Sequence, residues 1–212
     1  MKIFKDRTDA GQQLGKALEK YRRKGALVLA IPRGGVPVAF EVARALNAPL
    51  DVIVSRKLPI PWNTEAGFGA LAPDGTAYID QESASQLGLG QGSIEKIKKE
   101  IWSEIKRRQK VFRGKKRFPN LKNKVVILID DGLATGSTMK ASIEFVKKKK
   151  PQKIICALPV CSYGSYKEVK KMADEIICLD IKKSYPFAVA DSYENWYDLD
   201  DKEVLEYLKK IF

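Results

Sequence analysis

Short apolar runs alternate along the chain with longer segments whose apolar residues recur every three or four positions. The apolar runs have the length of strands, and none shows the strict alternation of a strand with one wet face. They cover 26–31, 51–55, 125–130, 153–160 and 175–179. Strands buried on both faces and separated by helices predict a three-layer α/β/α fold around a mostly parallel, twisted sheet.

Helical periodicity predicts helices between and around these strands. Their approximate ranges are 8–24, 38–46, 93–112, 136–150, 165–173 and 200–212. The expected N-terminal caps are Asp6 or Thr8 for the first helix, Ser93 for the third and Ser165 for the fifth. Residues 68–80 predict two strands around a Pro-Asp-Gly turn, and the Gly, Ser and Gln content of 81–92 predicts a loop.

The length and composition fit a soluble globular protein. The 212 residues, 44% of them hydrophobic, suit a single domain over 1–212 with a sizeable core. No apolar run approaches the roughly 18 residues of a membrane span, and the first residues lack the apolar stretch of a secretory signal. We therefore expect a cytoplasmic protein with no membrane partner.

The sequence contains no histidine. This excludes a Ser-His-Asp triad, a Cys-His dyad and a histidine general base. The three cysteines, Cys156, Cys161 and Cys178, lack the paired spacing of zinc ligands, so no direct metal site is expected from them. Any chemistry must then depend on carboxylates, lysine, tyrosine, backbone amides or a metal ion that arrives with the substrate.

Most of the formal net charge of +13 lies in residues 94–124, which hold 13 basic and three acidic side chains. Such a segment can contact the phosphates of a nucleic acid, or it can simply be a solvated face rich in lysine. No aromatic residues are interleaved in the way that a base-reading surface needs, which favours the solvated face. Nucleic acid therefore remains a partner that the sequence does not favour.

The segment Val125–Met139, VVILIDDGLATGSTM, carries the clearest functional pattern. A predicted strand ends in Asp130 and Asp131, and a loop of small and hydroxyl residues leads into a helix. Backbone N–H groups, hydroxyls and the helix dipole favour a phosphate in this loop. The two carboxylates would repel that phosphate, but they suit the hydroxyls of a sugar. The segment therefore predicts a ribose 5-phosphate site, although it lacks the Walker A and dinucleotide patterns.

This signature segment resembles the phosphoribosyl-pyrophosphate signature of type I phosphoribosyltransferases. The segments FKDRTDAGQQL, IPRGGVPVAFEVARAL, LDVIVSRKL and FAVADSYENW resemble a branch of predicted phosphoribosyltransferases. The resemblance implies the phosphoribosyltransferase type of sheet, with a small hood at 184–199 and a basic loop-and-helix insertion at 81–124. It also implies Mg²⁺-dependent transfer of a phosphoribosyl group from phosphoribosyl pyrophosphate to a nucleobase-like acceptor, with release of pyrophosphate.

The resemblance also assigns roles to residues. It implies that ribose 5-phosphate is bound by Asp130, Asp131, Ala134, Thr135, Gly136, Ser137 and Thr138. Pyrophosphate binding falls to Arg33, Gly34, Gly35, Arg56 and Lys57, with Arg56 and Lys57 expected to end the second strand. The expected catalytic residues are Asp130, Asp131 and Arg33, with Mg²⁺ held by the ligand near the two aspartates. In relatives the first loop can hold a non-proline cis peptide, for which Arg33–Gly34 is the candidate bond here.

The acceptor is the least defined part of the resemblance. Ala134 stands where hypoxanthine and guanine enzymes typically have an aspartate that serves the purine ring, which argues against a 6-oxopurine acceptor. The candidate hood offers aromatic rings that could stack on a flat base or pack in the core, namely Phe187, Tyr193 and Trp196. The mobile catalytic loop of the family has two candidates here, 58–67 and 81–92.

Other functions stay open at this point. A regulator that senses phosphoribosyl pyrophosphate or a nucleotide and binds nucleic acid would keep the same loop, but it would not need the diphosphate residues. An enzyme that hydrolyses or phosphorylates ribose 5-phosphate would not need a diphosphate clamp either. The Arg33-Gly34-Gly35 and Arg56-Lys57 pairings favour a transferase. A homodimer is left open.

Overall fold

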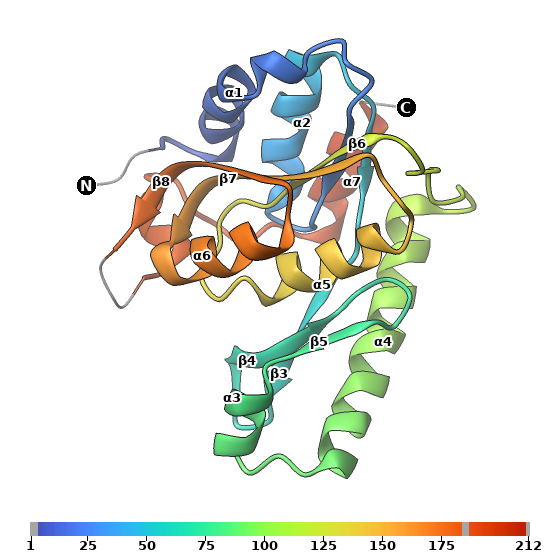
Figure 1. The fold of residues 1–212 in the computed structure, drawn as a ribbon, viewed down its shortest axis with the longest axis vertical. Helices are drawn as coiled ribbons and strands as arrows, with labels where there is room; N and C mark the ends of the chain where they lie inside the picture. Colours follow the sequence, from blue (N-terminus) through green and yellow to red (C-terminus); the bar gives the residue numbers. More distant parts are fainter. Residues whose placement is uncertain (1–3, 184–186, 211–212) are drawn as a thin grey trace.

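A computed structural model describes residues 4–183 and 187–210. Its central sheet has five parallel strands in the order β2-β1-β6-β7-β8 (Figure 1). The strands are β1 Leu27–Ala30, β2 Leu50–Val52, β6 Val125–Ile129, β7 Lys153–Ser162 and β8 Glu175–Lys182. All five overlap with predicted apolar runs, although β2 ends three residues earlier than predicted, and the predicted parallel sheet is confirmed.

Helices cover both faces of this sheet. Figure 1 shows α1 (Arg7–Ala17) and α2 (Gly35–Leu46) on one face, and α5 (Ser137–Lys147) and α6 (Tyr163–Met172) on the other. A short 3₁₀ turn, η1 (Glu19–Tyr21), follows α1, so the predicted first helix ends earlier than expected. The molecule therefore has the predicted three layers.

Alternate residues of one strand serve the two hydrophobic cores. On β1, Val28 and Ala30 pack into the core under α1 and α2, whereas Leu27 and Leu29 pack into the core under α5 and α6. Successive side chains of a strand point to opposite faces, so a strand covered on both sides must be apolar at every position. This explains why the predicted strands show continuous apolar runs.

A second, smaller sheet projects from the first. It is antiparallel, in the order β3-β4-β5, and its strands are β3 Arg56–Ile60, β4 Asn63–Leu71 and β5 Ala77–Ile79. Figure 1 shows these strands with α3 (Gln81–Gln86) below the main body, beside the long helix α4 (Gln91–Arg113). The hairpin predicted around the Pro-Asp-Gly turn is thus part of a separate sheet.

Four local predictions were wrong. Helix α6 starts at Tyr163 and is capped by Ser162, which accepts the Ser165 N–H, so Ser165 is not its cap. Residues 81–92 are not a continuous loop, because the Asp80 side chain accepts the Ser83 N–H and starts α3. Helix α4 starts after Gly90 and not after Ser93. Arg56 and Lys57 begin β3 and do not end β2, because the chain leaves the main sheet after Val52 and pairs with β4.

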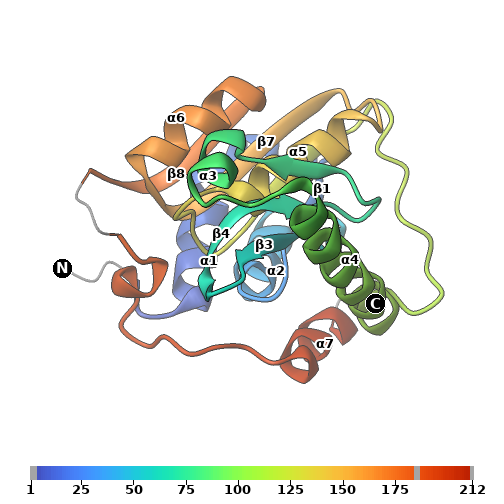
Figure 2. The same cartoon turned by 90° about the horizontal axis from the view of Figure 1, so that it is seen from below.

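The basic segment forms most of α4. Its apolar stripe is buried through Ile101, Ile105 and Phe112, as predicted from the helical spacing. Seen from below, α4 lies beside β3 and α7 (Asp201–Lys209) (Figure 2). The remaining faces of α4 are mostly exposed and carry its lysines and arginines. The helix therefore joins the small sheet to the main body.

The last described segment crosses the main body before it ends in α7. It contains the 3₁₀ turn η2 (Val189–Ser192), and α7 begins with a capping box between Asp200 and Glu203. The first three residues of the candidate hood, 184–186, lie outside the described residues. None of the helices described here is both long and apolar enough to cross a membrane.

Candidate active site

A polar cleft lies at the carboxyl ends of β1 and β6, where ligands bind in open α/β sheets. Its volume is about 380 Å³. It is lined by Arg7, Pro32, Arg33, Gly34, Ser55, Arg56, Lys57, Arg108, Asp131, Thr138, Val189, Trp196, Asp198 and Leu199. The loop after β1, the start of β3 and the signature segment therefore meet in one place, as the resemblance implied.

Asp131 is held from α1. The Nε of Arg7 donates to Oδ2 of Asp131 at 2.8 Å, and the Arg7 side chain is only 7% exposed. The same guanidinium donates to the Tyr197 carbonyl at 2.8 Å and lies 3.9 Å from the centroid of the Trp196 ring. Arg7 therefore fixes the Asp131 carboxylate and joins it to the segment after η2.

The carboxyls of Asp130 and Asp131 resist ionisation more than ordinary aspartates. Burial raises the pKa of Asp130 well above its usual range, and the adjacent charge of Asp131 adds to this rise. Burial also raises the pKa of Asp131, although Arg7 opposes the shift. The Asp131 N–H donates to Oδ1 of Asp130 at 2.9 Å. Such a pair favours hydroxyl donors or a further cation beside it.

The glycines after β1 allow the loop to approach these aspartates. A Cβ added to Gly34 would lie 1.8 Å from Oδ2 of Asp131, and one on Gly35 would lie 2.8 Å from the Ile129 carbonyl. Any larger residue would therefore displace the carboxylate or the strand end. The non-proline cis peptide is found at Pro32–Arg33, so the prediction of Arg33–Gly34 was wrong by one bond.

The loop after the aspartates is fixed by its neighbours. The Ala134 carbonyl accepts hydrogen bonds from the hydroxyls of Ser162 at 2.8 Å and Ser165 at 2.6 Å. Gly136 adopts a left-handed conformation with φ of 75°, and α5 begins directly after it with no side-chain cap. The first N–H groups of α5 are therefore available for an anion.

The hydroxyl residues of this loop lie at different depths. Thr138 lines the cleft, and Ser137 is 8% exposed. Thr135 is exposed, and its Oγ1 lies 3.5 Å from Oγ of Ser137. Ala134 is also exposed. The structure thus brings Asp131 and Thr138 to the cleft wall and places the other loop residues around the helix start.

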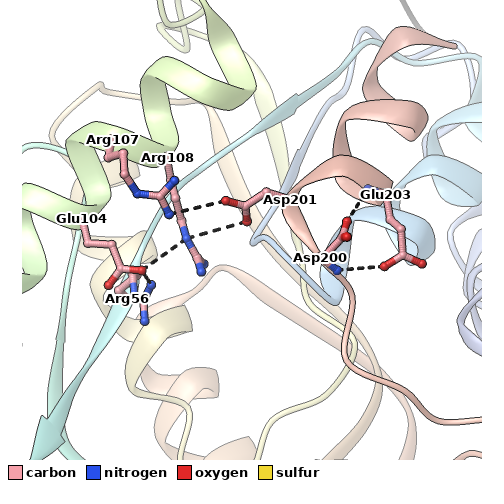
Figure 3. A network of polar contacts seen from close by, with 7 residues as sticks. All are labelled: Arg56, Glu104, Arg107, Arg108, Asp200, Asp201 and Glu203. Carbon is pink, nitrogen blue, oxygen red and sulfur yellow. Dashed lines mark hydrogen bonds and ion pairs between the residues drawn. The ribbon is translucent and has the colours of Figure 1, made fainter.

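Besides Arg7, four cations line the cleft: Arg33, Arg56, Lys57 and Arg108. Figure 3 shows how α4 contributes to this group. Glu104 forms ion pairs with both Arg56 and Arg108, the second at 3.6 Å between Oε1 and Nε. Burial and the nearby Arg56 lower the pKa of Arg108. The Glu104 carboxylate is thus shared between two guanidinium groups, and Arg33 adds further positive charge for an anionic ligand.

Helix α7 also takes part in this network. In Figure 3 Asp201 lies between α7 and α4, with Nη2 of Arg107 at 3.4 Å from its Oδ2 and Nε of Arg108 at 3.9 Å from its Oδ1. Asp201 is the first residue of the helix that the capping box of Asp200 and Glu203 begins. The orientation of Arg108 toward the cleft is therefore supported from two helices.

The three candidate hood aromatics have different surroundings. Tyr193 is fully buried against Phe4, and its hydroxyl donates to the Asp131 carbonyl at 2.5 Å. Phe187 is partly buried in the same small core. Trp196 lines the cleft, and Arg7 covers one face of its ring. In this arrangement Tyr193 supports the Asp131 loop, and Trp196 has the position that suits an acceptor.

Sequence reasoning missed two cleft residues, Arg7 and Arg108. Arg7 lies in a segment that carried the family resemblance, FKDRTDAGQQL, but nothing in its spacing indicated a contact with Asp131, 124 positions away. Arg108 was counted only as part of the basic segment. Its spacing of four residues from Glu104, on the same helix face, was the available signal.

Comparisons with known proteins agree with this geometry. The family model for the phosphoribosyl transferase domain matches residues 73–192. A Mycobacterium tuberculosis (strain H37Rv) protein named "Putative phosphoribosyl transferase Rv0571c" is 37% identical over 211 residues, which are 99% of this chain and 47% of that protein. The chain thus spans about half the length of the curated relatives that it matches.

Solved structures show the same fold. The TT1426 protein from Thermus thermophilus has a TM-score of 0.80 and 31% identity, and the match covers 98% of both chains. The AQ2163 protein from Aquifex aeolicus shares the fold at a TM-score of 0.52 and 15% identity, over 82% of this chain and 74% of that one. The predicted α/β fold and the family resemblance are confirmed. The chain belongs to the phosphoribosyl transferase family.

Proposed function

We propose that the protein transfers the phosphoribosyl group of phosphoribosyl pyrophosphate to a nucleobase-like acceptor and releases pyrophosphate. The observation that carries this proposal is the meeting of Asp131 and Thr138 with Arg33, Arg56 and Lys57 in one cleft. A sugar phosphate and a diphosphate need these two kinds of surface at adjacent positions. A ribose 5-phosphate ligand alone would bring no diphosphate for Arg33, Arg56 and Lys57 to bind.

Each side of the cleft has its own task in this proposal. The carboxylates of Asp130 and Asp131 accept hydrogen bonds from the ribose hydroxyls, and the N-terminus of α5 with Thr138 holds the 5-phosphate. The cations of Arg33, Arg56 and Lys57 bind the diphosphate and stabilise its charge as the C1–O bond breaks. The acceptor nitrogen takes the place of that oxygen on C1. Holding both partners in line supplies much of the rate.

The residues present fit a magnesium ion that arrives with the ligand. The raised pKa values of Asp130 and Asp131 mark a place where a further positive charge would stabilise two carboxylates. Mg²⁺ binds through one or two carboxylates together with substrate phosphates and water. The described residues contain no group of three or more potential ligands, so the ligand's own oxygens would supply most of the coordination. The ion would offset the charge of the diphosphate.

The acceptor side is formed by the segment after η2. Trp196 offers a ring at the cleft, and Ala134 offers no side-chain group to a purine ring. We therefore place the acceptor near Trp196 and expect it to be other than hypoxanthine or guanine. Adenine-type and pyrimidine-type acceptors are consistent with an alanine at this position.

The test is a scan of nucleobases and small amines with phosphoribosyl pyrophosphate and Mg²⁺, in which pyrophosphate release is measured. We expect release with at least one acceptor and none with the double variant Asp130→Asn/Asp131→Asn. Turnover by that variant at the wild-type rate would remove the assignment of the two aspartates. Tight binding of phosphoribosyl pyrophosphate without turnover for any acceptor would instead support a sensor.

Arg33→Ala separates the two sides of the cleft. This variant should weaken the binding of pyrophosphate, measured as product inhibition, more than it changes the preference among acceptors. A change in acceptor preference with unchanged pyrophosphate binding would contradict the role given to this loop.

A further inference from the structure

A second cavity lies on the other side of α4 from the cleft. Its volume is about 450 Å³, and it shares no lining residue with the cleft. It lies between the C-terminal half of α4, the edge strand β2 and the Phe145 ring of α5. We call it the α4 cavity. Its volume is typical of a site for one small molecule.

The α4 cavity is strongly cationic. Lys106, Lys110, Arg113 and Lys116 line it, and no acidic residue is among the described residues of its wall. Lys106 and Lys110 are exposed, and neither forms an ion pair within the described part of the chain. The ammonium of Lys106 instead lies 4.3 Å from the Trp102 ring centroid. Lys106 and Lys110 therefore bring two positive charges that no acidic residue of the described wall offsets, whereas Arg113 is paired with Asp51.

The Arg113 side chain in the wall of this cavity is held in place by several contacts. It pairs with Asp51, its Nη2 donates to the Arg117 carbonyl at 2.7 Å, and its side chain is 9% exposed. The spacing of Lys106, Lys110 and Arg113 along α4 places them on one helix face. One ordered arginine and two exposed lysines thus line the same space.

Part of the wall is apolar, and it lies next to Arg113, whose guanidinium carbon is 5.0 Å from the Phe118 ring centroid. Phe118 and Phe145 meet edge to face with centroids 5.2 Å apart, next to Val52 and Val54. Apolar walls limit the solvent around the cations and strengthen their attraction for an anion. A concave pocket of this size does not fit a nucleic acid duplex, which would need an extended surface. The geometry favours a small, multiply charged anion.

We propose that the α4 cavity is a second anion site, which binds an oligophosphate such as inorganic triphosphate or the triphosphate group of a nucleotide. This site is independent of the proposed transferase reaction. It also gives part of the basic segment 94–124 a role that a solvated face would not have. Glu104 and Arg108 lie on the cleft side of the same helix, so α4 would carry an anion site on each of two faces.

The test is calorimetric titration with inorganic triphosphate. Because the cleft is also cationic, the titration uses an Arg33→Gln/Lys57→Gln background in which binding at the cleft is weakened. Adding Lys106→Gln/Lys110→Gln should lower the remaining affinity by about tenfold or more. Both lysines are exposed, so the fold should be retained, as a melting curve would show.

The matched control is Lys96→Gln/Lys122→Gln in the same background, which removes two exposed lysines outside both sites. It should change the affinity by no more than about twofold. If Lys106→Gln/Lys110→Gln lowers the affinity for triphosphate no more than this control does, the proposal is overturned.

Two further titrations identify the ligand. Adenosine and uridine triphosphates are compared with inorganic triphosphate in the same variants. If both bind more tightly and still depend on Lys106 and Lys110, the ligand is a nucleotide whose ring lies on the Phe118 side. Equal affinities would show an oligophosphate recognised by charge alone. If the binding of a short RNA duplex depends on Lys106 and Lys110, and the binding of triphosphate does not, the cavity is part of a nucleic acid surface and the proposal is overturned.

Discussion

Gly34 lies so close to Asp131 that a single added methyl group would occupy the space of the carboxylate. The added Cβ would be 1.8 Å from Oδ2, which is the oxygen that accepts the hydrogen bond from Arg7. The backbone of Gly34 is itself ordinary, with φ of −60° and ψ of −31°. The glycine is therefore required by the contact and not by the backbone conformation.

Gly34→Ala should displace the Asp131 carboxylate without straining the backbone. We expect loss of phosphoribosyl pyrophosphate binding in calorimetry and a destabilisation of about 1–3 kcal/mol in urea unfolding. Gly92→Ala is the control, because it lies in α4 with nothing within 4 Å of an added Cβ. That control should be neutral or slightly stabilising. Normal binding by Gly34→Ala would contradict the position given to Asp131.

Arg7→Ala should remove the partner of a buried carboxylate. We expect the free energy of unfolding to fall by about 3–5 kcal/mol, because the charge of Asp131 would be left without its ion pair. Arg22→Ala breaks an exposed pair with Glu19 and should cost less than about 1 kcal/mol. Chemical unfolding of the two variants measures the difference. Equal losses would show that Arg7 does not stabilise the site.

Asp130 should change how the free energy of unfolding depends on pH. Its pKa is raised in the folded protein, so the folded state binds a proton before the unfolded state does as the pH falls. Its contribution to stability therefore increases as the pH falls toward the ordinary aspartate pKa of about 4. Asp130→Asn should lose this increase, whereas Asp191→Asn, at an exposed position, should behave like the wild type. Parallel curves for the wild type and Asp130→Asn would contradict the raised pKa.

Glu175 should have the opposite effect. Although burial opposes it, hydrogen bonds from Lys153, Lys20 and Tyr21 lower its pKa from 4.5 to about 2. The stabilisation that it provides is complete above pH 4.5 and is lost as the pH falls toward 2. Glu175→Gln should therefore be less stable than the wild type at neutral pH and approach it in acid. Glu19→Gln, in an exposed pair, should show little change at either pH.

The inner strands β1, β6 and β7 could be predicted because they are buried on both faces and are therefore almost wholly apolar. Helix α3 could not, since QESASQ has no apolar periodicity and depends on the Asp80 cap. The small sheet was predicted only as a hairpin. Its separation from the main sheet depends on the turn at Ile53–Ser55, where the Ser55 N–H donates to the Ile53 carbonyl at 3.0 Å.

The residues of the candidate site also form two groups: those that a local sequence pattern predicts and those that depend on tertiary packing. Asp131, Thr138, Arg33 and Gly34 lie in local sequence patterns, and the structure brings them together at the cleft. Arg7 and Arg108 depend on how helices pack, and a single sequence does not state which helix face meets the cleft. For Tyr193 the sequence left open whether it stacks on a base or packs in the core, and the small core around Phe4 buries it.

Arg7 contacts Asp131 and Tyr197 across 124 and 190 positions of the chain. Contacts between such distant segments close large loops and form late, after local helices and strand pairs. During refolding, helical circular dichroism should therefore return before the protein regains its affinity for phosphoribosyl pyrophosphate. The same holds during synthesis, because Arg7 gains both of its partners only after the segment that contains Tyr197 has left the ribosome.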